Sequence, residues 1–356
     1  MSPDTIYHGD CIEVLNGFPP KCVDLIFADP PYNLQLKKEL LRPNQSQVDG
    51  VSDDWDRFGS FAEYDAFTRD WLSACRRVLK DTGAIWVIGS YHNIHRVGTI
   101  LQDLGYWILN DVSWIKTNPM PNFRGVRLCN AHETLIWAKK SERQKRYTFN
   151  YKALKLDNKG LQMRSDWYFP ICSGPERLRQ EGVKFHSTQK PEALIERIIR
   201  GCSNPGDLVL DPLCGTGTTP AVAKRLARRY IGIDREGKYV RAAESRLNCV
   251  ISEMFDPLYV PPAPPRVPFR ALIELGLLRP ETDLQIGKNR LIARVTDRGT
   301  LARNGTEASI HRMGAKLLGW PACNGWEHWR YPNEAGEYRP LDELRAKARE
   351  MLGLAG

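Results

Sequence analysis

The sequence lacks the features that would place the chain in a membrane, on a metal ion or in a disulfide framework. No apolar run approaches the length of about twenty residues that crosses a bilayer, and the first four residues lead into a strand pattern without a secretory signal. The nine cysteines are scattered, with no Cys-x-x-Cys pair and no Cys/His cluster at metal-ligand spacing. We therefore expect a soluble, cytoplasmic protein with reduced thiols, no metal and no membrane contact.

An excess of acidic residues is also missing. The 356 residues carry a formal net charge of +9, and the apolar fraction of 42% is ordinary for a globular protein. A basic surface favours polyanionic partners, because Lys and Arg displace counterions from phosphates, although a solvated basic surface is the alternative. The length allows two domains.

One short motif ends a buried strand pattern. Residues 23–28 are apolar and rich in β-branched and aromatic side chains, and Asp29-Pro30-Pro31-Tyr32 stops them, because proline cannot continue a strand ladder. The motif would lie at the carboxyl edge of an open α/β sheet, where ligands bind. The Asp29 carboxylate and the Pro30 carbonyl can accept both hydrogens of an exocyclic amino group, and Tyr32 can stack on a flipped base. The alternative is a tight turn.

A second ligand motif comes late in the chain. A strand over residues 207–210 leads into Asp211-Pro212-Leu213-Cys214-Gly215-Thr216-Gly217-Thr218-Thr219, and a helix is expected over 220–229. Glycines let the backbone approach a ligand, and N–H groups at the helix start point into the site. The next strand, over 230–233, ends in Asp234, where a carboxylate can meet ribose hydroxyls. Pro220 replaces the third glycine of a dinucleotide fingerprint, which favours an adenosyl ligand without a pyrophosphate.

Two polar segments accompany these motifs. Asp10 and Cys11 follow a strand over residues 5–7, and Asp10 either faces a cofactor or caps the next helix. Residues 186–190 precede Pro191 at a helix start, and they either hold a carboxylate or form a plain N-cap.

Three further stretches are polar and basic. Residues 33–59 form a long segment without periodicity, residues 116–131 carry amides and cations between prolines, and residues 139–185 interleave basic with aromatic side chains. Residues 116–131 suit contact with base edges, and the alternative for them is a plain surface loop. Residues 139–185 suit phosphate contact and base stacking, and the alternative for them is an insertion packed on the domain.

The remaining periodicity completes an α/β pattern. Ser60 and Glu63 form a capping box before a helix that Gly83 ends. We expect strands over 84–88, 106–114 and 132–138, and helices over 94–104 and 236–254. Six prolines in residues 257–268 indicate a stiff linker, which separates a domain of residues 1–256 from a smaller one of residues 269–356.

Together these motifs resemble the amino-methylating DNA methyltransferases that use S-adenosylmethionine. The catalytic motif precedes the cofactor motif, as in their β group, whose Rossmann-like sheet is a circular permutation of the usual methyltransferase fold. The closer resemblance is to the cell-cycle-regulated adenine methyltransferases, the CcrM family. It is carried by His8-Gly9-Asp10-Cys11, the run from Asp29 to Leu36, Asn118-Pro119-Met120-Pro121-Asn122-Phe123, Thr188-Gln189-Lys190-Pro191 and the tail that contains Trp326.

The resemblance implies methylation of adenine N6 in double-stranded GANTC by a nucleoid-associated homodimer that flips its target base and serves DNA replication and the cell cycle. The implied catalytic residues are Asp29, Pro30, Pro31 and Tyr32. The implied cofactor-binding residues are Asp10, Cys11, His186, Ser187, Thr188, Lys190, Asp211, Cys214, Gly215, Gly217, Thr218 and Asp234. The implied DNA-binding residues are Arg42, His92, Asn122, Arg124 and Arg164, with Ser309, Asn324 and Trp326 in a C-terminal DNA-recognition domain.

Other functions remain open at this point. N4-cytosine methylation needs the same site geometry, and a DNA-binding regulator on the same fold needs no turnover. A C5-cytosine enzyme is disfavoured, because it would need a nucleophilic cysteine directly after a proline and the sequence has no Pro-Cys pair.

Overall fold

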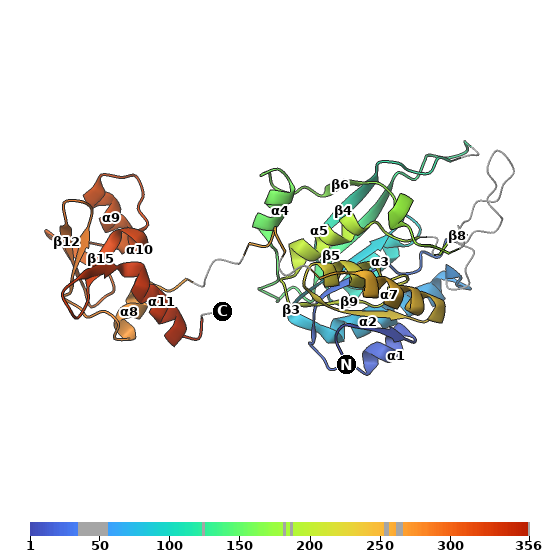
Figure 1. The fold of residues 1–356 in the computed structure, drawn as a ribbon, viewed down its shortest axis with the longest axis horizontal. Helices are drawn as coiled ribbons and strands as arrows, with labels where there is room; N and C mark the ends of the chain where they lie inside the picture. Colours follow the sequence, from blue (N-terminus) through green and yellow to red (C-terminus); the bar gives the residue numbers. More distant parts are fainter. Residues whose placement is uncertain are drawn as a thin grey trace. The chain divides into compact units, whose positions relative to one another are not determined.

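The computed structural model of the protein describes residues 1–34, 56–122, 125–180, 183–185, 188–252, 256–260 and 266–354. The chain divides into two compact units, Met1–Val260 and Pro261–Gly356. Each unit has its own hydrophobic core (Figure 1).

The first unit is built on a mixed eight-stranded sheet. Its strands are β1 (Thr5–His8), β2 (Val23–Ala28), β3 (Leu79–Gly89), β4 (Trp107–Lys116), β5 (His132–Lys139), β6 (Asp166–Phe169), β9 (Leu208–Asp211) and β10 (Arg229–Asp234). They lie in the order β1-β10-β9-β2-β3-β5-β4-β6. The first five strands in this order, β1, β10, β9, β2 and β3, are parallel to one another. Strand β5 is antiparallel to both of its neighbours, β3 and β4. The parallel strands therefore end at one edge of the sheet.

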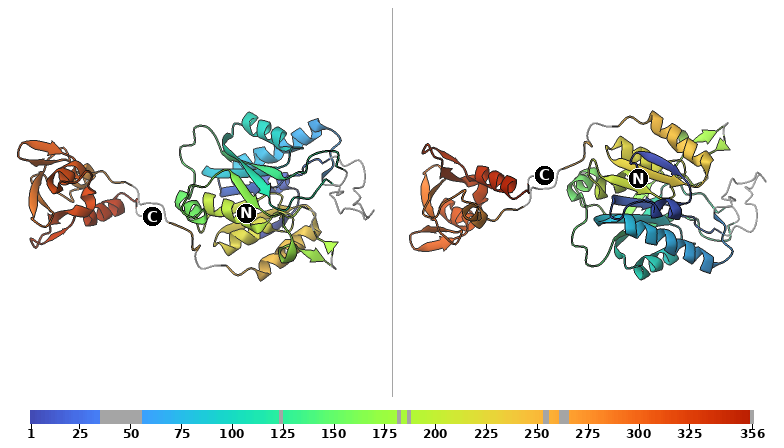
Figure 2. Two further views of the ribbon diagram at one scale, coloured as in Figure 1. Left: turned by 90° about the horizontal axis from the view of Figure 1, so that it is seen from above. Right: turned by 90° about the horizontal axis from the view of Figure 1, so that it is seen from below.

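Helices cover both faces of this sheet (Figure 2). They are α1 (Cys11–Asn16), α2 (Phe61–Val78), α3 (Ile94–Asp103), α4 (Tyr151–Asp157), α5 (Glu192–Cys202), α6 (Thr218–Arg225) and α7 (Gly237–Cys249). Successive strand side chains point to opposite faces, so β2 supplies Leu25 and Phe27 to the core under α5, α6 and α7, and Ile26 to the core under α1, α2 and α3. A small hairpin, β7 (Arg179–Gln180) and β8 (Val183–Lys184), stands apart from the sheet.

The second unit is a six-stranded antiparallel sheet with short helices. Its strands are β11 (Asp283–Ile286), β12 (Leu291–Val295), β13 (Leu301–Arg303), β14 (Thr306–Ala308), β15 (Trp329–Pro332) and β16 (Tyr338–Pro340). Its helices are α8 (Phe269–Glu274), α9 (Ile310–Leu318), α10 (Gly325–His328) and α11 (Leu341–Met351). Trp326 and Trp329 lie in its core.

The predicted strands and helices are confirmed, but several boundaries were wrong, among them the start of β3, which lies at Leu79 and not at 84. Helix α2 ends at Val78 and not at Gly83, because Leu79 takes an extended conformation and pairs with Val23 in the sheet. Helix α6 ends at Arg225 and not at 229, since Ala227 has a φ of 60° that no helix accommodates. Helix α7 ends at Cys249 and not at 254.

The basic stretch of residues 139–185 includes regular secondary structure. It contains α4 and β6, and β6 pairs in parallel with β4 at the sheet edge. The Trp167 indole is buried in the core, and Phe149 packs on Trp137 with ring centroids 5.3 Å apart. These two aromatic side chains therefore pack within the domain, as expected for an insertion packed on it.

Two findings concern what the described residues do not contain. None of their helices has both the length and the apolar character needed to cross a membrane. Within the same residues, no group of three or more His, Cys, Asp or Glu side chains is placed to hold a metal ion.

Candidate active site

The turn after β2 is held by a buried carboxylate. Because two prolines end the strand ladder, the next three backbone N–H groups need partners elsewhere. Asp56 accepts hydrogen bonds from the N–H groups of Tyr32, Asn33 and Leu34, at 2.6, 2.8 and 3.0 Å. Only 4% of Asp56 is exposed. The Asp56 carboxylate therefore holds the backbone at the end of the Asp29–Tyr32 motif in place.

Helices α2 and α3 brace the same turn from the side. The Tyr64 hydroxyl donates to the Pro31 carbonyl at 2.9 Å. The Asn93 amide donates to that hydroxyl at 3.1 Å, and its oxygen accepts from the Ser90 N–H at 3.0 Å. The motif thus has little freedom to move before a ligand arrives.

Asp29 has one occupied and one free oxygen. Its Oδ2 accepts a hydrogen bond from Lys190 Nζ at 2.6 Å. Its Oδ1 is buried and has no hydrogen-bond partner among the described residues. Burial raises the pKa of Asp29, and the Lys190 ammonium counteracts this. A buried acceptor without a partner is costly unless a ligand satisfies it.

Tyr32 is anchored through its hydroxyl. The phenol donates to Glu133 Oε2 at 2.8 Å, and Glu133 Oε1 pairs with Lys116 Nζ at 2.8 Å. Burial, with the negative charges of Asp29 and Glu133, raises the pKa of Tyr32 well above its usual value, so the phenol stays protonated and donates. The ring is 9% exposed, and Lys190 Nζ lies 5.1 Å from its centroid.

The second motif forms the opposite side of the site. Asp234, at the end of β10, accepts from the Gly215 and Glu236 N–H groups at 2.9 and 2.8 Å, and Asp211 accepts from the Leu213 N–H at 3.1 Å. Burial raises the pKa of Asp211 to about 7 and that of Asp234 to about 6. These carboxylates are acceptors for hydroxyl and amino donors.

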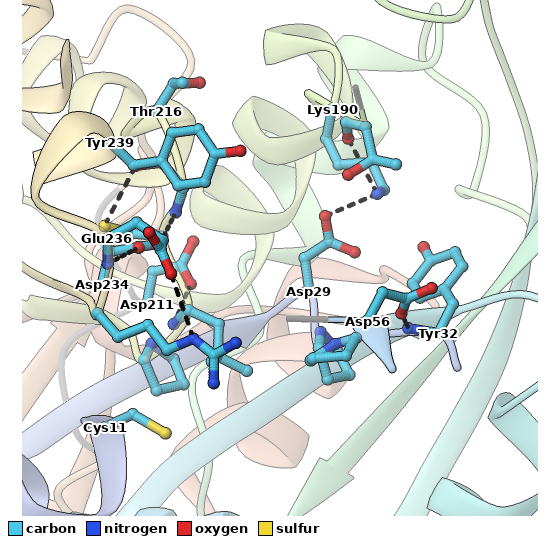
Figure 3. Close-up of a pocket in the computed structure, with 18 of the residues that line it drawn as sticks. Cys11, Asp29, Tyr32, Asp56, Lys190, Asp211, Thr216, Asp234, Glu236 and Tyr239 are labelled. Atoms are coloured by element: carbon cyan, nitrogen blue, oxygen red, sulfur yellow. Dashed lines mark hydrogen bonds and ion pairs between the residues drawn. The ribbon is translucent and has the colours of Figure 1, made fainter. Parts of the chain in front are cut away.

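Both motifs line one cavity of about 270 Å³ (Figure 3). In the figure Asp29 stands between Tyr32 on one side and Asp211, Asp234 and Glu236 on the other. Most of the residues predicted for catalysis and cofactor binding line this cavity: Asp10, Cys11, Asp29, Pro30, Pro31, Tyr32, Thr188, Lys190, Asp211, Cys214, Gly215, Thr218 and Asp234. The fold therefore joins two motifs that lie far apart in the sequence.

Several predicted cofactor residues have a structural role as well. Asp10 caps α1 by accepting from the Ile12 and Glu13 N–H groups at 2.9 and 3.2 Å. Gly217 precedes α6 with a φ of 74°, and a Cβ there would lie 2.7 Å from the Ala243 Cβ. Lys190 is bonded to Asp29, which the sequence analysis did not foresee. His186 and Ser187 lie outside the described residues.

The predicted DNA-binding residues are placed unevenly. Asn122 and His92 are partly exposed, and Arg164 pairs with Asp166 on the surface. In the second unit Ser309 caps α9, and the exposed Asn324 donates to Glu327. Arg42 and Arg124 lie outside the described residues.

Trp326, which the resemblance implies to bind DNA, is largely buried. Its ring is 5% exposed in the core of the second unit, where it meets Phe269 edge-on and Arg345 over its face. Because the indole is enclosed by that core, it has almost no surface to offer DNA.

Sequence reasoning missed three residues of the site. Asp56 stood in a segment without periodicity, and Glu133 and Lys116 stood at strand ends among other charged residues. A polar residue at the end of an apolar strand is the available signal, but it does not say which distant side chain it will meet.

Comparisons with known proteins agree with this architecture. A family described as DNA methylase matches residues 23–245, and one described as Restriction Enzyme Adenine Methylase Associated matches residues 260–352. The chain is 49% identical to the Type II methyltransferase M.HinfI of Haemophilus influenzae over 345 residues, 96% of each protein. It is 41% identical to the Type II methyltransferase M2.LlaDCHI of Lactococcus lactis subsp. cremoris over 244 residues, 68% of this chain and 88% of that protein.

Solved structures similar to the chain include two further methyltransferases. The complex of M1.HpyAVI with SAM has 28% identity and a TM-score of 0.51, and the match covers 68% of this chain and 98% of the other. The cytosine-N4-specific PvuII DNA methyltransferase has 23% identity and a TM-score of 0.55, covering 69% and 86%. At that identity the second likeness concerns the fold alone.

Proposed function

The chain belongs to the DNA methylase family, and from this membership we propose that it transfers a methyl group from S-adenosylmethionine to adenine N6 in double-stranded DNA, at GANTC sites. The observation that carries the proposal is the free Oδ1 of Asp29, in the same cavity as Gly215 and Asp234. The family match of residues 260–352 supports adenine as the target. The GANTC sequence rests on the resemblance of the motifs to the CcrM family.

The residues beside the glycine turn fit the methyl donor. Asp234 would hold the ribose hydroxyls, and Asp10 and Cys11 would lie by the adenine of the cofactor. Asp211 and Thr218 would line the remainder of the ligand. Carboxylate acceptors suit its hydroxyl and ammonium donors, and Gly215 brings backbone close to it. When bound, S-adenosylmethionine supplies an electrophilic methyl carbon on a sulfonium.

The residues after β2 act on the target amino group. Asp29 Oδ1 and the Pro30 carbonyl oxygen accept hydrogen bonds from the two N6 hydrogens. These bonds draw the nitrogen toward tetrahedral geometry and free its lone pair for attack on the methyl carbon. Tyr32 stacks on the flipped base. As the N6–methyl bond forms, the bond between the methyl carbon and the sulfonium sulfur would break and S-adenosylhomocysteine would leave. N6 then releases one proton to solvent, and no covalent bond to the protein forms. Much of the rate comes from holding the nucleophile in place.

The strand order supports a circularly permuted sheet of the β group. Strands β9 and β10, which carry the cofactor motif, come after the catalytic strand β2 in the chain. In the sheet, however, β9 lies directly beside β2, with Leu25 opposite Val209. The adjacency of β9 and β2 therefore brings both motifs to one edge of the sheet.

The remaining proposals concern context. We assign DNA recognition to the second unit and to the segments around residues 33–59 and 116–131, in a homodimer. We place the enzyme in the cytoplasm, associated with the nucleoid, in the service of DNA replication and the cell cycle. These assignments follow from the CcrM resemblance and the net charge of +9.

Product mapping tests the proposed reaction. The purified protein is incubated with S-adenosylmethionine and a plasmid that contains every short sequence, and the modified bases are then identified. We expect N6-methyladenine confined to GANTC. N4-methylcytosine would establish the rival reaction, and an absence of any methyl transfer would favour a DNA-binding regulator on the same fold.

Replacing Asp29 tests the amino-holding role. In Asp29→Ala the amino group loses its charged acceptor, so the methylation rate should fall by about 10²-fold or more, as when a key electrostatic group leaves an active site. Cofactor affinity, measured by calorimetry, should change little because Asp234 and Gly215 remain. Methylation near the wild-type rate would rule out the proposed grip on the amino group.

A further inference from the structure

Lys190 lies at the centre of the candidate site and is almost fully enclosed. Its side chain is 7% exposed, and Nζ donates to Asp29 Oδ2 at 2.6 Å and to the Thr188 carbonyl at 3.2 Å. The same nitrogen lies over the Tyr32 ring. In Figure 3 Lys190 lies on the Tyr32 side of Asp29, away from Asp211, Asp234 and Glu236. Its position is therefore on the target-base side of the cavity.

The charges around this lysine alternate in sign. Lys190 interacts with Asp29 and also with Glu133, whose oxygens are bonded to Tyr32 and Lys116. Among the described residues, the charged and titratable groups that interact with Asp29 or Lys190 come from several elements: Tyr32 after β2, Glu133 on β5, Arg177 before β7 and Asp211 at the end of β9. Lys116, at the end of β4, pairs with Glu133. Lys190 is the cation bonded to Asp29.

We propose that Lys190 is a positioning residue for methyl transfer, which holds Oδ2 of Asp29 so that Oδ1 points to the target amino group and keeps Asp29 a carboxylate. This inference rests on the proposed function of the site. It replaces the expectation that Lys190 holds the carboxylate of the cofactor.

The physical reason lies in desolvation. Burial raises the pKa of Asp29, and a base and a cofactor in the cavity would remove further water. A protonated Asp29 would be a poorer acceptor and could not offset the positive charge that develops on N6. Lys190 opposes the protonation, while Glu133 favours it, because their charges have opposite signs.

Two substitutions in this cluster should act in opposite directions. In Lys190→Met the cation is lost, so the pKa of Asp29 rises and methylation should need a higher pH. In Glu133→Gln a negative charge is lost, so the pKa of Asp29 falls and the acid limb of the pH–rate profile should shift to lower pH. Gln can still accept the Tyr32 hydrogen bond. Lys190→Arg keeps the charge and should leave the limb close to its wild-type position.

The experiment measures single-turnover methylation of a GANTC duplex between about pH 6 and pH 9 with cofactor bound, so that product release does not mask the chemical step. Below the pKa of Asp29 in Lys190→Met, the variant rate should fall by up to about tenfold for each unit by which the pH is lowered, so the ratio of wild-type to variant rate should rise as the pH falls. Cofactor affinity, measured by calorimetry on the same proteins, should stay within about threefold of wild type, well under the tenfold that 1.4 kcal/mol represents. Bound cofactor also shows that each variant is folded.

The outcomes separate the possibilities. Opposite displacements of the acid limb in Lys190→Met and Glu133→Gln support the positioning role. A loss of activity in Lys190→Met that is independent of pH overturns it, and so does a loss of cofactor affinity that accounts for the whole effect. If Lys190→Met does not fold, the Glu133→Gln limb decides, and an unmoved limb overturns the inference. Failure of the wild-type enzyme to methylate would refute the proposed function instead.

Discussion

At the residue scale, three carboxylates of the site differ in what surrounds them. Asp29 has a bonded cation and a free oxygen, whereas Asp234 accepts two backbone N–H groups and Asp211 accepts one. Burial raises the pKa of all three, and among the described residues a lysine is hydrogen-bonded only to Asp29 of the three. One residue type therefore serves both as the proposed acceptor of the target amino group and as the proposed cofactor ligand.

A fourth carboxylate, Asp56, does its work on the backbone. Asp56→Ala removes the acceptor of the Tyr32, Asn33 and Leu34 N–H groups, so we expect a loss of at least about 1–3 kcal/mol in unfolding free energy, the cost of one such unsatisfied group. Methylation should fall more than cofactor affinity, because the damaged turn carries Tyr32. Chemical denaturation and single-turnover assays measure both effects.

Asp103→Ala is the matched control for that substitution. Asp103 pairs with Arg69 at 3.2 Å on the surface, and about half of each side chain is exposed (51% and 46%). Exposed pairs contribute at most about 1 kcal/mol, so this variant should be close to wild type in stability and activity. An Asp56→Ala protein as stable and active as the control would contradict the proposed support of the turn.

At the scale of elements, the start of α6 depends on a close approach to α7. Gly217 has a φ of 74°, and its missing side chain leaves room for Ala243 of α7. The absence of a side chain at Gly217 thus lets the cofactor turn and the start of α6 pack closely against α7. Elsewhere in the sheet the carboxyl ends of β2, β9 and β10 bring Asp29, Asp211 and Asp234 to one edge.

Gly217→Ala should therefore weaken cofactor binding and stability together, because a Cβ 2.7 Å from the Ala243 Cβ forces the helices apart. Gly206→Ala is the control: its φ is 86°, but no atom lies within 4 Å of the added Cβ. The control should lose only the backbone cost of a left-handed alanine, about 1 kcal/mol. Calorimetric cofactor titrations of both variants make the comparison. Equal effects in the two would show that the contact with Ala243 is unimportant.

At the scale of the whole molecule, the division after Val260 separates two kinds of unit. The first contains the cavity with both motifs, and the second has its own core around Trp329 and Leu284. Asp256, close to the boundary, is buried and pairs with Arg228 at 2.9 Å and Arg200 at 3.0 Å. The end of the first unit is thereby anchored to its own body.

A fragment of residues 1–260 should fold and bind cofactor, because it keeps the cavity and the Asp256 pairs. If the second unit recognises DNA as proposed, the fragment should bind a GANTC duplex at least about tenfold more weakly, a loss of 1.4 kcal/mol. The salt dependence of its affinity should also be shallower, since fewer phosphates are neutralised. Titrations at several salt concentrations measure both. A fragment with the full affinity and salt dependence would assign DNA recognition to the first unit.

The sequence by itself determined the elements whose signals are local. The apolar run before Asp29, the glycine turn before α6 and the cap of α2 each involve neighbours within a few residues. Ser60 accepts from the Glu63 N–H at 3.1 Å as predicted, although the Glu63 carboxylate bonds the Gly59 N–H in place of that of Ser60.

Only the tertiary structure decided which distant side chains meet. Lys190 and Asp29 are 161 residues apart in the chain, and Glu133 and Tyr32 are 101 apart. The end of α2 at Val78 depended on the pairing of Leu79 with Val23, and the burial of Trp326 depended on the core around it. A sequence pattern records the preference of a segment for a conformation, whereas these contacts exist because the folded sheets and their hydrophobic cores bring separate segments together.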